Sequence, residues 1–387
     1  MDPLRNISTS LRNALTWSPF ATNTNNERQP QSIKLPDLIN SVPEIGRAFR
    51  INKFTREASS ASESWANTYI GPSLRDDQSE PPNSDIELNT GLLAAICFPT
   101  VALAQLKLCS YFTTWVIMVE DYLSLSEKEV ALDQINILIT LVQNEPGSTE
   151  ITDPCFARGL QNILRQLEGL PSSRDLYDRF QSSIENYLQL LLEIYEDKNL
   201  EFYSALNRYT GAGWHQSLFI LTEYSLSLDF SPNSGSDRTK LDAIRDAAST
   251  VIVLALHIYA AAGHIVCPSR ANLTKIYGLL PLDISNLNQI QDTFDKAGET
   301  FVDYSRRFAK LMSDCGSSET STTTLSQDER LYANAAGDCV NGILHWPFES
   351  NRYFGQNASY VHMTSLLVPL NVPVSYIPNQ HGVNNTF

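Results

Sequence analysis

The sequence has few charged residues and no closely spaced cysteines. Charged residues make up 18% of the 387 residues, below the roughly 25% of an average domain. Acidic residues outnumber basic ones and give a net charge of −15, which argues against a nucleic-acid-binding protein. The six cysteines form no CxxC pair, so the sequence predicts neither a zinc site nor a disulfide framework. We expect reduced, buried thiols.

The sequence also lacks a secretion signal and a membrane-spanning run. Polar residues interrupt the N-terminus after Arg5, where a signal peptide would be continuously apolar. The most apolar stretch, Leu92 to Val119, contains Pro99, Gln105 and Lys107, whereas a membrane helix needs about 20 uninterrupted apolar residues. We therefore expect a cytoplasmic protein without a transmembrane segment.

Strand-like alternation is almost absent from the sequence. Beyond Asp85, apolar residues recur at i, i+3, i+4 and i+7, which is typical of amphipathic helices. We predict that residues 90–360 form an all-α bundle around an apolar pocket. Residues 1–89 are expected to form a polar, partly disordered leader with short helices, and residues 361–387 to form a tail. The predicted helices span residues 91–107, 109–124, 127–144, 156–168, 174–196, 199–211, 213–227, 238–265, 285–313 and 326–353.

The most informative motif lies near the C-terminus. Trp346 stands six residues before the pair Arg352 and Tyr353, which places an aromatic face and two hydrogen-bond donors near one helix end. This string resembles the C-terminal signature of microbial, fungal-type class I terpene synthases. The resemblance implies an all-α fold with a deep aromatic cavity. It also implies that Arg352 and Tyr353 bind the diphosphate of a prenyl diphosphate and that Trp346 faces the carbocation.

The resemblance further implies an acidic metal motif at the end of an apolar helix, where carboxylates bind Mg²⁺. Glu120 and Asp121 follow the apolar run that contains Trp115. The motif is degraded, because Glu120 stands in place of the first Asp and Ser124 in place of the last acid. The resemblance assigns Glu120 and Asp121 as catalytic Mg²⁺ ligands and Trp115 as a cavity aromatic.

A diphosphate sensor is expected next, and the string Asn207 to Trp214 resembles it. The register stays open between Asn207 and Arg208, although Arg208 carries the guanidinium that suits phosphate. Gly211 would interrupt the helix at this sensor. A surface arginine beside an ordinary helix cap is the alternative.

The second metal motif of the family is missing. The best alignment puts His257, Ala261 and Ile265 at its three ligand positions, and alanine and isoleucine cannot bind Mg²⁺. A complete metal cluster is therefore not expected. His257 and His264 lie seven residues apart on one helix face, so His257 is a candidate general base, with two core histidines as the alternative.

Three functions are compatible with these residues. The resemblance favours a lyase of secondary metabolism that ionises and cyclises a prenyl diphosphate of fifteen carbons, farnesyl diphosphate, to a sesquiterpene. A second hypothesis is a metal-independent acid/base enzyme that acts on a preformed terpenoid or another neutral substrate through His257 or Glu120. A third is a catalytically silent protein that binds a hydrophobic ligand. The chain is expected to be a monomer or a homodimer.

Overall fold

The computed structural model describes residues 32–41, 50–71, 88–144, 155–168, 174–196, 201–228, 230, 238–266, 273–280, 287–316, 326–364 and 366–369. Most of the predicted polar leader, including residues 1–31, and most of the predicted tail, from residue 370, lie outside these residues. A single compact unit begins at Ser32.

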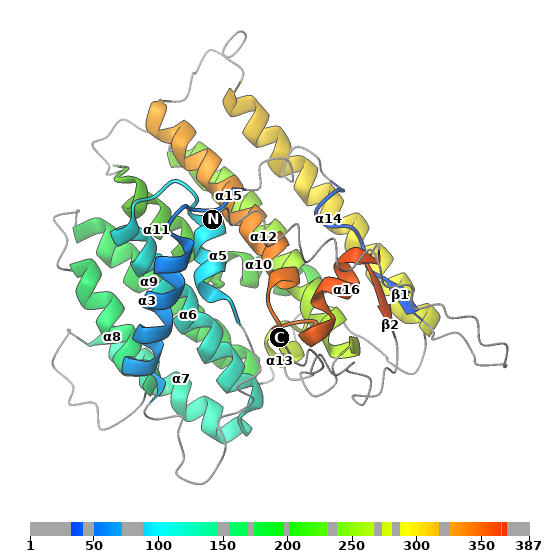
Figure 1. Ribbon diagram of the computed structural model, residues 1–387, viewed down its shortest axis with the longest axis horizontal. Coiled ribbons are helices and arrows are strands. Elements are labelled where there is room, and N and C mark those ends of the chain that lie inside the picture. The colour runs from blue at the N-terminus through cyan, green and yellow to red at the C-terminus, as the bar shows by residue number, and fades with distance from the viewer. Residues whose placement is uncertain are drawn as a thin grey trace, which may run out of the picture. The chain divides into compact units, whose positions relative to one another are not determined.

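The described residues form helices almost throughout (Figure 1), which confirms the predicted all-α class. The helices are α3 (Thr55–Tyr69), α5 (Thr90–Cys97), α6 (Leu103–Leu125), α7 (Lys128–Gln143), α8 (Cys155–Glu168), α9 (Arg174–Tyr195), α10 (Phe202–Ala212), α11 (His215–Leu226), α12 (Arg238–Val266), α13 (Leu273–Ile276), α14 (Leu287–Gly316), α15 (Gln327–Glu349) and α16 (Ala358–Met363), with a 3₁₀ turn η2 (Gly355–Asn357) before α16.

Three helix boundaries differ from the prediction by four residues or more: α5 ends early, α6 begins early and α15 ends early. The segment 91–107 is two helices, because α5 ends at Cys97 and α6 begins at Leu103. Pro99 explains the break, since proline lacks the N–H and clashes with the preceding helical turn. The last long helix ends at Glu349 rather than at residue 353, two residues after Pro347.

Helix α12 is the centre of the fold. It packs against α10, α11, α13, α14 and α15, and every residue from Ala248 to Gly263 is buried. By length and composition this helix could cross a membrane, but 83% of its most apolar window is buried inside the protein. Burial in the core accounts for its hydropathy.

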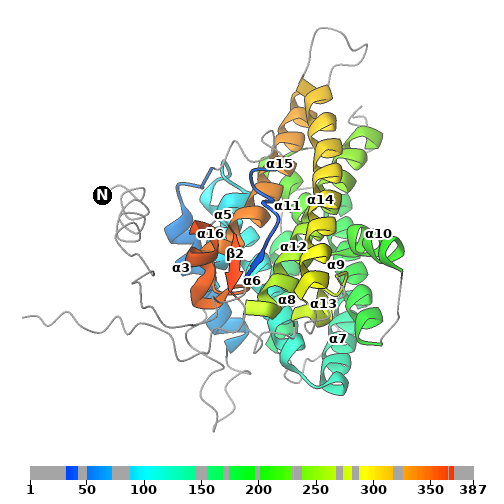
Figure 2. The ribbon, with the colours of Figure 1, turned by 90° about the vertical axis from the view of Figure 1, so that its right-hand side faces the viewer.

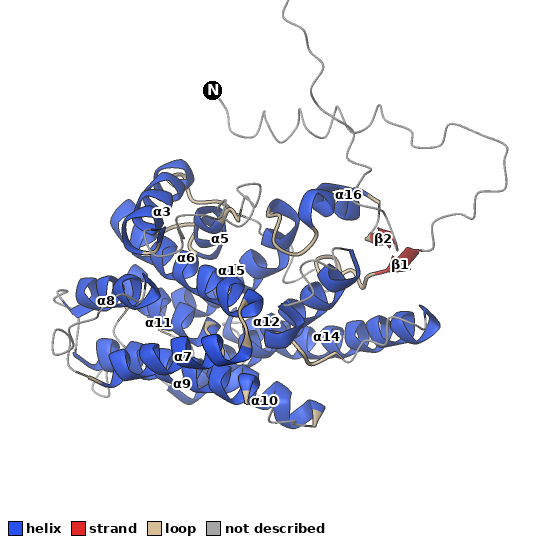
Figure 3. Ribbon diagram, turned by 90° about the horizontal axis from the view of Figure 1, so that it is seen from below, coloured by secondary structure: helices blue, strands red, loops and turns tan. Residues whose placement is uncertain are grey.

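Two short strands join the two ends of the described chain. Strand β1 (Ser32–Lys34) pairs antiparallel with β2 (Leu367–Pro369), and Ile33 lies opposite Val368. Figures 2 and 3 show this small ribbon beside α16, outside the helical bundle. Ile33 and Val368 are buried in the hydrophobic core, where β1 contacts α14 and β2 contacts α12, so the ribbon covers part of a core that is mainly helical in the described residues.

Three cysteines in the described ranges test the predicted thiols. Cys97, Cys109 and Cys339 are buried and carry no disulfide. The prediction of reduced, buried thiols is confirmed for these three residues.

Glycine allows α12 to approach the segment that follows α15. A Cβ atom added at Gly263 would lie 2.6 Å from the carbonyl oxygen of Tyr353, closer than atoms pack. Gly211, which was expected to interrupt a helix, lies inside α10 on its exposed side and has no atom within 4 Å of an added Cβ. The two glycines therefore have different structural roles.

Replacement of these glycines by alanine should have opposite effects. Gly263→Ala should lower the free energy of unfolding by about 1–3 kcal/mol, because the new methyl group overpacks the contact with Tyr353. Gly211→Ala should raise it by up to about 1 kcal/mol, because alanine favours a helix. Urea denaturation measures both. Equal stability of Gly263→Ala and the wild type would contradict the close contact.

Candidate active site

Arg352 brings the two predicted motifs together. Its side chain is 1% exposed, and Nη2 donates to Glu120 Oε2 at 2.8 Å while Nε donates to Asp121 Oδ1 at 2.9 Å. Nη1 donates to the hydroxyl oxygen of Tyr353 at 3.3 Å. These four residues therefore form one polar cluster, although more than 230 positions separate the arginine from the acids.

The ends of two helices position this cluster. Glu120 and Asp121 lie in the last turns of α6, whose preceding residues are largely buried. Arg352 follows the end of α15, where the Trp346 indole N–H lies 3.0 Å from the carbonyl oxygen of Leu88 and 3.1 Å from that of Asn89. Trp346 thus fixes the end of α15 against the segment before α5.

Glu120 is completely buried and fully hydrogen-bonded. The Tyr277 hydroxyl lies 2.7 and 2.6 Å from its two oxygens, and the Tyr187 hydroxyl donates to Oε1 at 3.1 Å. Burial raises the pKa of the Glu120 carboxyl, against the effects of Arg352 and Tyr277. Burial and the nearby carboxylate raise the pKa of both tyrosines. The tyrosine hydroxyls therefore remain protonated and donate to Glu120.

Arg352 remains charged in this environment. Burial opposes its charge, but Asp121, Tyr353 and Glu120 together raise the pKa of the guanidinium above its ordinary value. A buried ion pair with these additional hydrogen bonds meets the condition under which attraction compensates for lost hydration.

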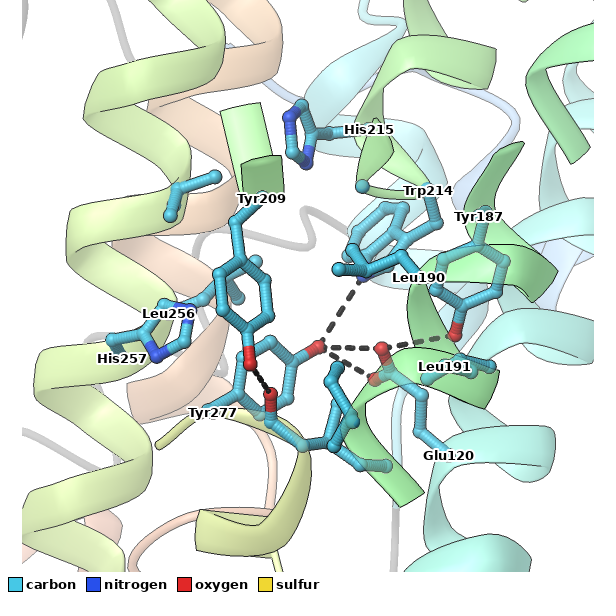
Figure 4. A pocket seen from close by; sticks show the side chains of 14 residues that line it. Glu120, Tyr187, Leu190, Leu191, Tyr209, Trp214, His215, Leu256, His257 and Tyr277 are labelled. Carbon is cyan, nitrogen blue, oxygen red and sulfur yellow. Dashed lines mark hydrogen bonds between the residues drawn. The ribbon is translucent and has the colours of Figure 1, made fainter. Parts of the chain in front are cut away.

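An apolar cavity begins at Glu120 (Figure 4). The tyrosine and tryptophan side chains of α9, α10 and the segments beside α11 and α13 line it, with leucines and valine from α9 and α12. Figure 4 shows the Tyr277 hydroxyl between the Trp214 indole and Glu120, with Tyr187 on the other side of the carboxylate. The cavity volume is about 20 Å³, enough for about one water molecule. The predicted pocket is therefore present beside Glu120, but it is nearly filled by its own side chains.

Several predicted residues lie away from this cavity. Arg208 pairs with Glu193 at 2.9 Å and is one-third exposed. The Trp115 indole N–H donates to the carbonyl oxygen of Phe156 at 2.9 Å. The fourteen residues that line the cavity, all within the described ranges, include neither Trp115 nor Trp346. Both indoles contact backbone carbonyls instead.

His257 lines the cavity, and its ring is held from both sides. The Leu279 N–H donates to Nδ1 at 3.2 Å, and the rings of Tyr209 and Tyr277 meet the imidazole edge to face. Burial lowers the pKa of His257 to about 3. The imidazole is therefore neutral, and its Nδ1 lone pair is used by the segment after α13.

The sequence analysis did not identify the tyrosines at this site. Tyr187, Tyr209 and Tyr277 lie on three different elements, and no spacing connects them. Trp214 and His215 also line the cavity, and the string that was searched for the diphosphate sensor ends at Trp214. That string was the one feature of the sequence that pointed to residues lining this cavity.

The residues present do not fit a complete magnesium cluster. Within the described ranges, no group of three or more His, Cys, Asp or Glu side chains is placed to hold a metal ion. Ala261 and His257 are buried in the core, and both oxygens of Glu120 already accept hydrogen bonds. Asp121, with a side-chain exposure of 26%, is the more accessible of the two carboxylates. The positive charge at this site comes from Arg352.

Known proteins resemble the whole chain. No model of a known protein family matches it. Sesquiterpene synthase Agr8 of Cyclocybe aegerita is 22% identical over 92% of this chain and 97% of its own length. Sesquiterpene synthase 6 of Postia placenta is 24% identical over 86% and 94%, respectively. Over most of its length the chain is therefore similar to fungal sesquiterpene synthases, at low sequence identity.

Solved structures show the same fold. The linalool/nerolidol synthase of Streptomyces clavuligerus, crystallised with 2-fluorogeranyl diphosphate, superimposes with a TM-score of 0.58. It covers 78% of this chain and 97% of its own length at 14% sequence identity. The class I terpene synthase fold predicted from the C-terminal motif is therefore confirmed.

Loss of Arg352 should destabilise the protein strongly. Arg352→Met leaves Glu120 buried without a counter-charge, so we expect a loss of about 3–5 kcal/mol in the free energy of unfolding. Arg208→Met, which removes the partly exposed pair with Glu193, should cost less than about 1 kcal/mol. Urea denaturation compares the two variants. Similar losses would show that the buried cluster contributes no more than a surface pair.

His257 should make stability depend on pH. In the unfolded chain histidine titrates near pH 6.5, whereas His257 in the folded chain stays neutral down to about pH 3. As the pH falls below about 6.5, the unfolded state therefore binds a proton that the folded state does not, and stability decreases. His257→Asn retains an acceptor without this titration. Between about pH 6 and pH 4.5, the free energy of unfolding of His257→Asn should fall less steeply than that of the wild type. The two slopes should differ by up to about 1.4 kcal/mol per pH unit.

Proposed function

We propose that this chain binds a fifteen-carbon prenyl diphosphate and converts it to a sesquiterpene. The observation that carries the proposal is the cluster of Glu120, Asp121, Arg352 and Tyr353, in which Glu120 also lines the apolar cavity. The two sesquiterpene synthases named above support it by their similarity over nearly the whole chain. We place this activity in the cytoplasm, in a monomer or a homodimer.

Arg352 and Tyr353 are the groups of this chain suited to a diphosphate. Guanidinium and phenol donors next to one another match the oxygens of a leaving diphosphate, and hydrogen bonds to such charged groups are the strong ones. Class I terpene synthases generally use Mg²⁺. In this proposal Mg²⁺ accompanies the diphosphate at most through Asp121, since Ala261 and Ile265 provide no ligand.

The cavity supplies the apolar and aromatic surface for the prenyl chain. Trp214, Tyr209 and Tyr187 line it, and aromatic faces stabilise a developing cation. We propose these three rings as the aromatic wall of the reacting site, in place of Trp115 and Trp346. The cavity must enlarge from about 20 Å³, because ligand pockets usually measure about 300–1,000 Å³.

A second candidate function is favoured by the saturation of Glu120. A carboxylate that accepts from Arg352 and two tyrosines suits a metal-independent enzyme that acts on a neutral terpenoid. In that case Glu120 or His257 would transfer a proton, and neither Mg²⁺ nor a diphosphate would be required.

Product analysis distinguishes the two functions. The purified chain is incubated with ten-, fifteen- and twenty-carbon prenyl diphosphates, with Mg²⁺ and with a chelator, and the hydrocarbons and alcohols are identified by mass. Turnover of the fifteen-carbon substrate supports the cyclase. Absence of turnover with every diphosphate in both conditions contradicts it.

Three substitutions rank the residues by their role. Arg352→Ala should reduce kcat/KM for the fifteen-carbon diphosphate by about 10- to 100-fold, the effect of one charge-assisted contact. Arg208→Ala should change it less than about threefold, because Arg208 pairs with Glu193. His257→Ala should cost less than Arg352→Ala. If His257→Ala were inactive while Arg352→Ala and Glu120→Gln remained active, the acid/base function would be correct instead.

A further inference from the structure

The polar cluster is occupied by the chain itself. Arg352 donates to Glu120, Asp121 and Tyr353, so all three nitrogens of the guanidinium have a partner. The guanidinium of Arg352 is in contact with two acidic side chains, Glu120 and Asp121. A polyanion that approaches this cluster therefore meets like charge, and its natural binding group is already paired.

Glu120 and Asp121 differ in their availability. The Glu120 side chain is 1% exposed and that of Asp121 is 26% exposed. The three donors of Glu120 come from three separate elements: Tyr187 from α9, Tyr277 from the residue after α13, and Arg352 from the segment after α15. A Mg²⁺ ion needs free carboxylate oxygens and coordinated water, and Glu120 offers neither.

We propose that Glu120 is the internal counter-anion of Arg352 and that an anionic ligand binds by displacing it from the guanidinium. That the ligand is a diphosphate rests on the proposed function; the displacement rests on the geometry. Glu120 stands where the family resemblance assigns a metal ligand. A metal ligand would strengthen the binding of a diphosphate, whereas a counter-anion of Arg352 competes with it.

The displaced carboxylate keeps hydrogen-bond partners. Tyr277 and Tyr187 still donate to Glu120 after Arg352 turns to the ligand, so the carboxylate stays hydrogen-bonded although it loses its ion pair, and the ligand must compensate for that loss. Asp121 also continues to balance the charge of Arg352. The protein can therefore exchange one anion for another within the fold.

Tyr277 strengthens the internal pair. Its hydroxyl contacts both oxygens of Glu120 and accepts from the Trp214 indole N–H at 3.3 Å, while its ring lies near Arg352, with the guanidinium carbon 6.0 Å from the ring centroid. Removal of the hydroxyl should loosen Glu120 while the ring remains. Tyr277→Phe therefore tests the displacement without removing either charge.

Binding of inorganic pyrophosphate, measured calorimetrically on the full chain, tests the proposal. Parallel titrations contain either a chelator or Mg²⁺ at equal pH and ionic strength. The variants are Glu120→Gln, Tyr277→Phe and Arg352→Met. Glu223→Gln is the matched control, because Glu223 forms a comparable pair with Arg179, at 2.9 and 2.7 Å, outside the polar cluster. Circular dichroism confirms that each variant folds.

When the chelator is present, Glu120→Gln should bind pyrophosphate at least about tenfold more tightly than the wild type, because the ligand no longer has to replace one charge-assisted contact. Tyr277→Phe should tighten binding by a smaller factor, Glu223→Gln should leave it unchanged, and Arg352→Met should abolish it.

Three results would overturn the proposal, and they can be told apart. If Glu120→Gln bound pyrophosphate more weakly than the wild type only when Mg²⁺ is present, Glu120 would be a metal ligand. Equal binding by wild type, Glu120→Gln and Tyr277→Phe, with loss in Arg352→Met, would disprove the displacement but leave the anion site and the proposed function intact. No binding by any variant in either condition would remove the anion site itself, and with it both proposals.

Discussion

The buried ion pair between Arg352 and Glu120 is the interaction on which the candidate site depends. It joins the end of α6 to the segment after α15, and a pair with side chains only 1% exposed is stable only when further hydrogen bonds surround it. Tyr187 and Tyr277 provide them from two other parts of the bundle. One pair of charges therefore constrains the relative positions of four parts of the chain, and its Glu120 also lines the cavity.

The lost metal motif and the buried arginine are connected. Two carboxylates at the end of an apolar helix need positive charge nearby, and in metal-dependent relatives of this fold that charge includes Mg²⁺. Here Ala261 and His257 are buried apolar or neutral groups on α12, so these two positions supply no negative charge. Arg352 then compensates both Glu120 and Asp121.

Helical periodicity predicted most of the fold, and motif order predicted the approach of Glu120 and Asp121 to Arg352. Pro99 and Pro347 show the limit at boundaries, because one ends a helix early and the other lies inside α15. The orientation of the tryptophans was beyond the sequence, since an indole N–H selects a backbone carbonyl that only the tertiary packing supplies. Tyr187 and Tyr277 carry no spacing signal, because a half-apolar side chain fits a core position as well as a binding site. Cavity volume depends on all of these side chains at once.

Tyr277 closes the site in two ways at the same time. Its hydroxyl holds Glu120 on Arg352, and its ring lies between the guanidinium and His257, 6.0 and 5.3 Å from its centroid. The segment that carries it is also tied to α10 and α12, through the Tyr209 hydroxyl on the Ile276 carbonyl and the Leu279 N–H on His257. A ligand must provide enough binding energy to replace these contacts. An anion alone replaces only the contact of Arg352, and an apolar molecule alone replaces only the packing of the cavity. A molecule with an anionic head and an apolar chain would replace both, so under the proposed function the whole prenyl diphosphate should bind more tightly than either of its parts.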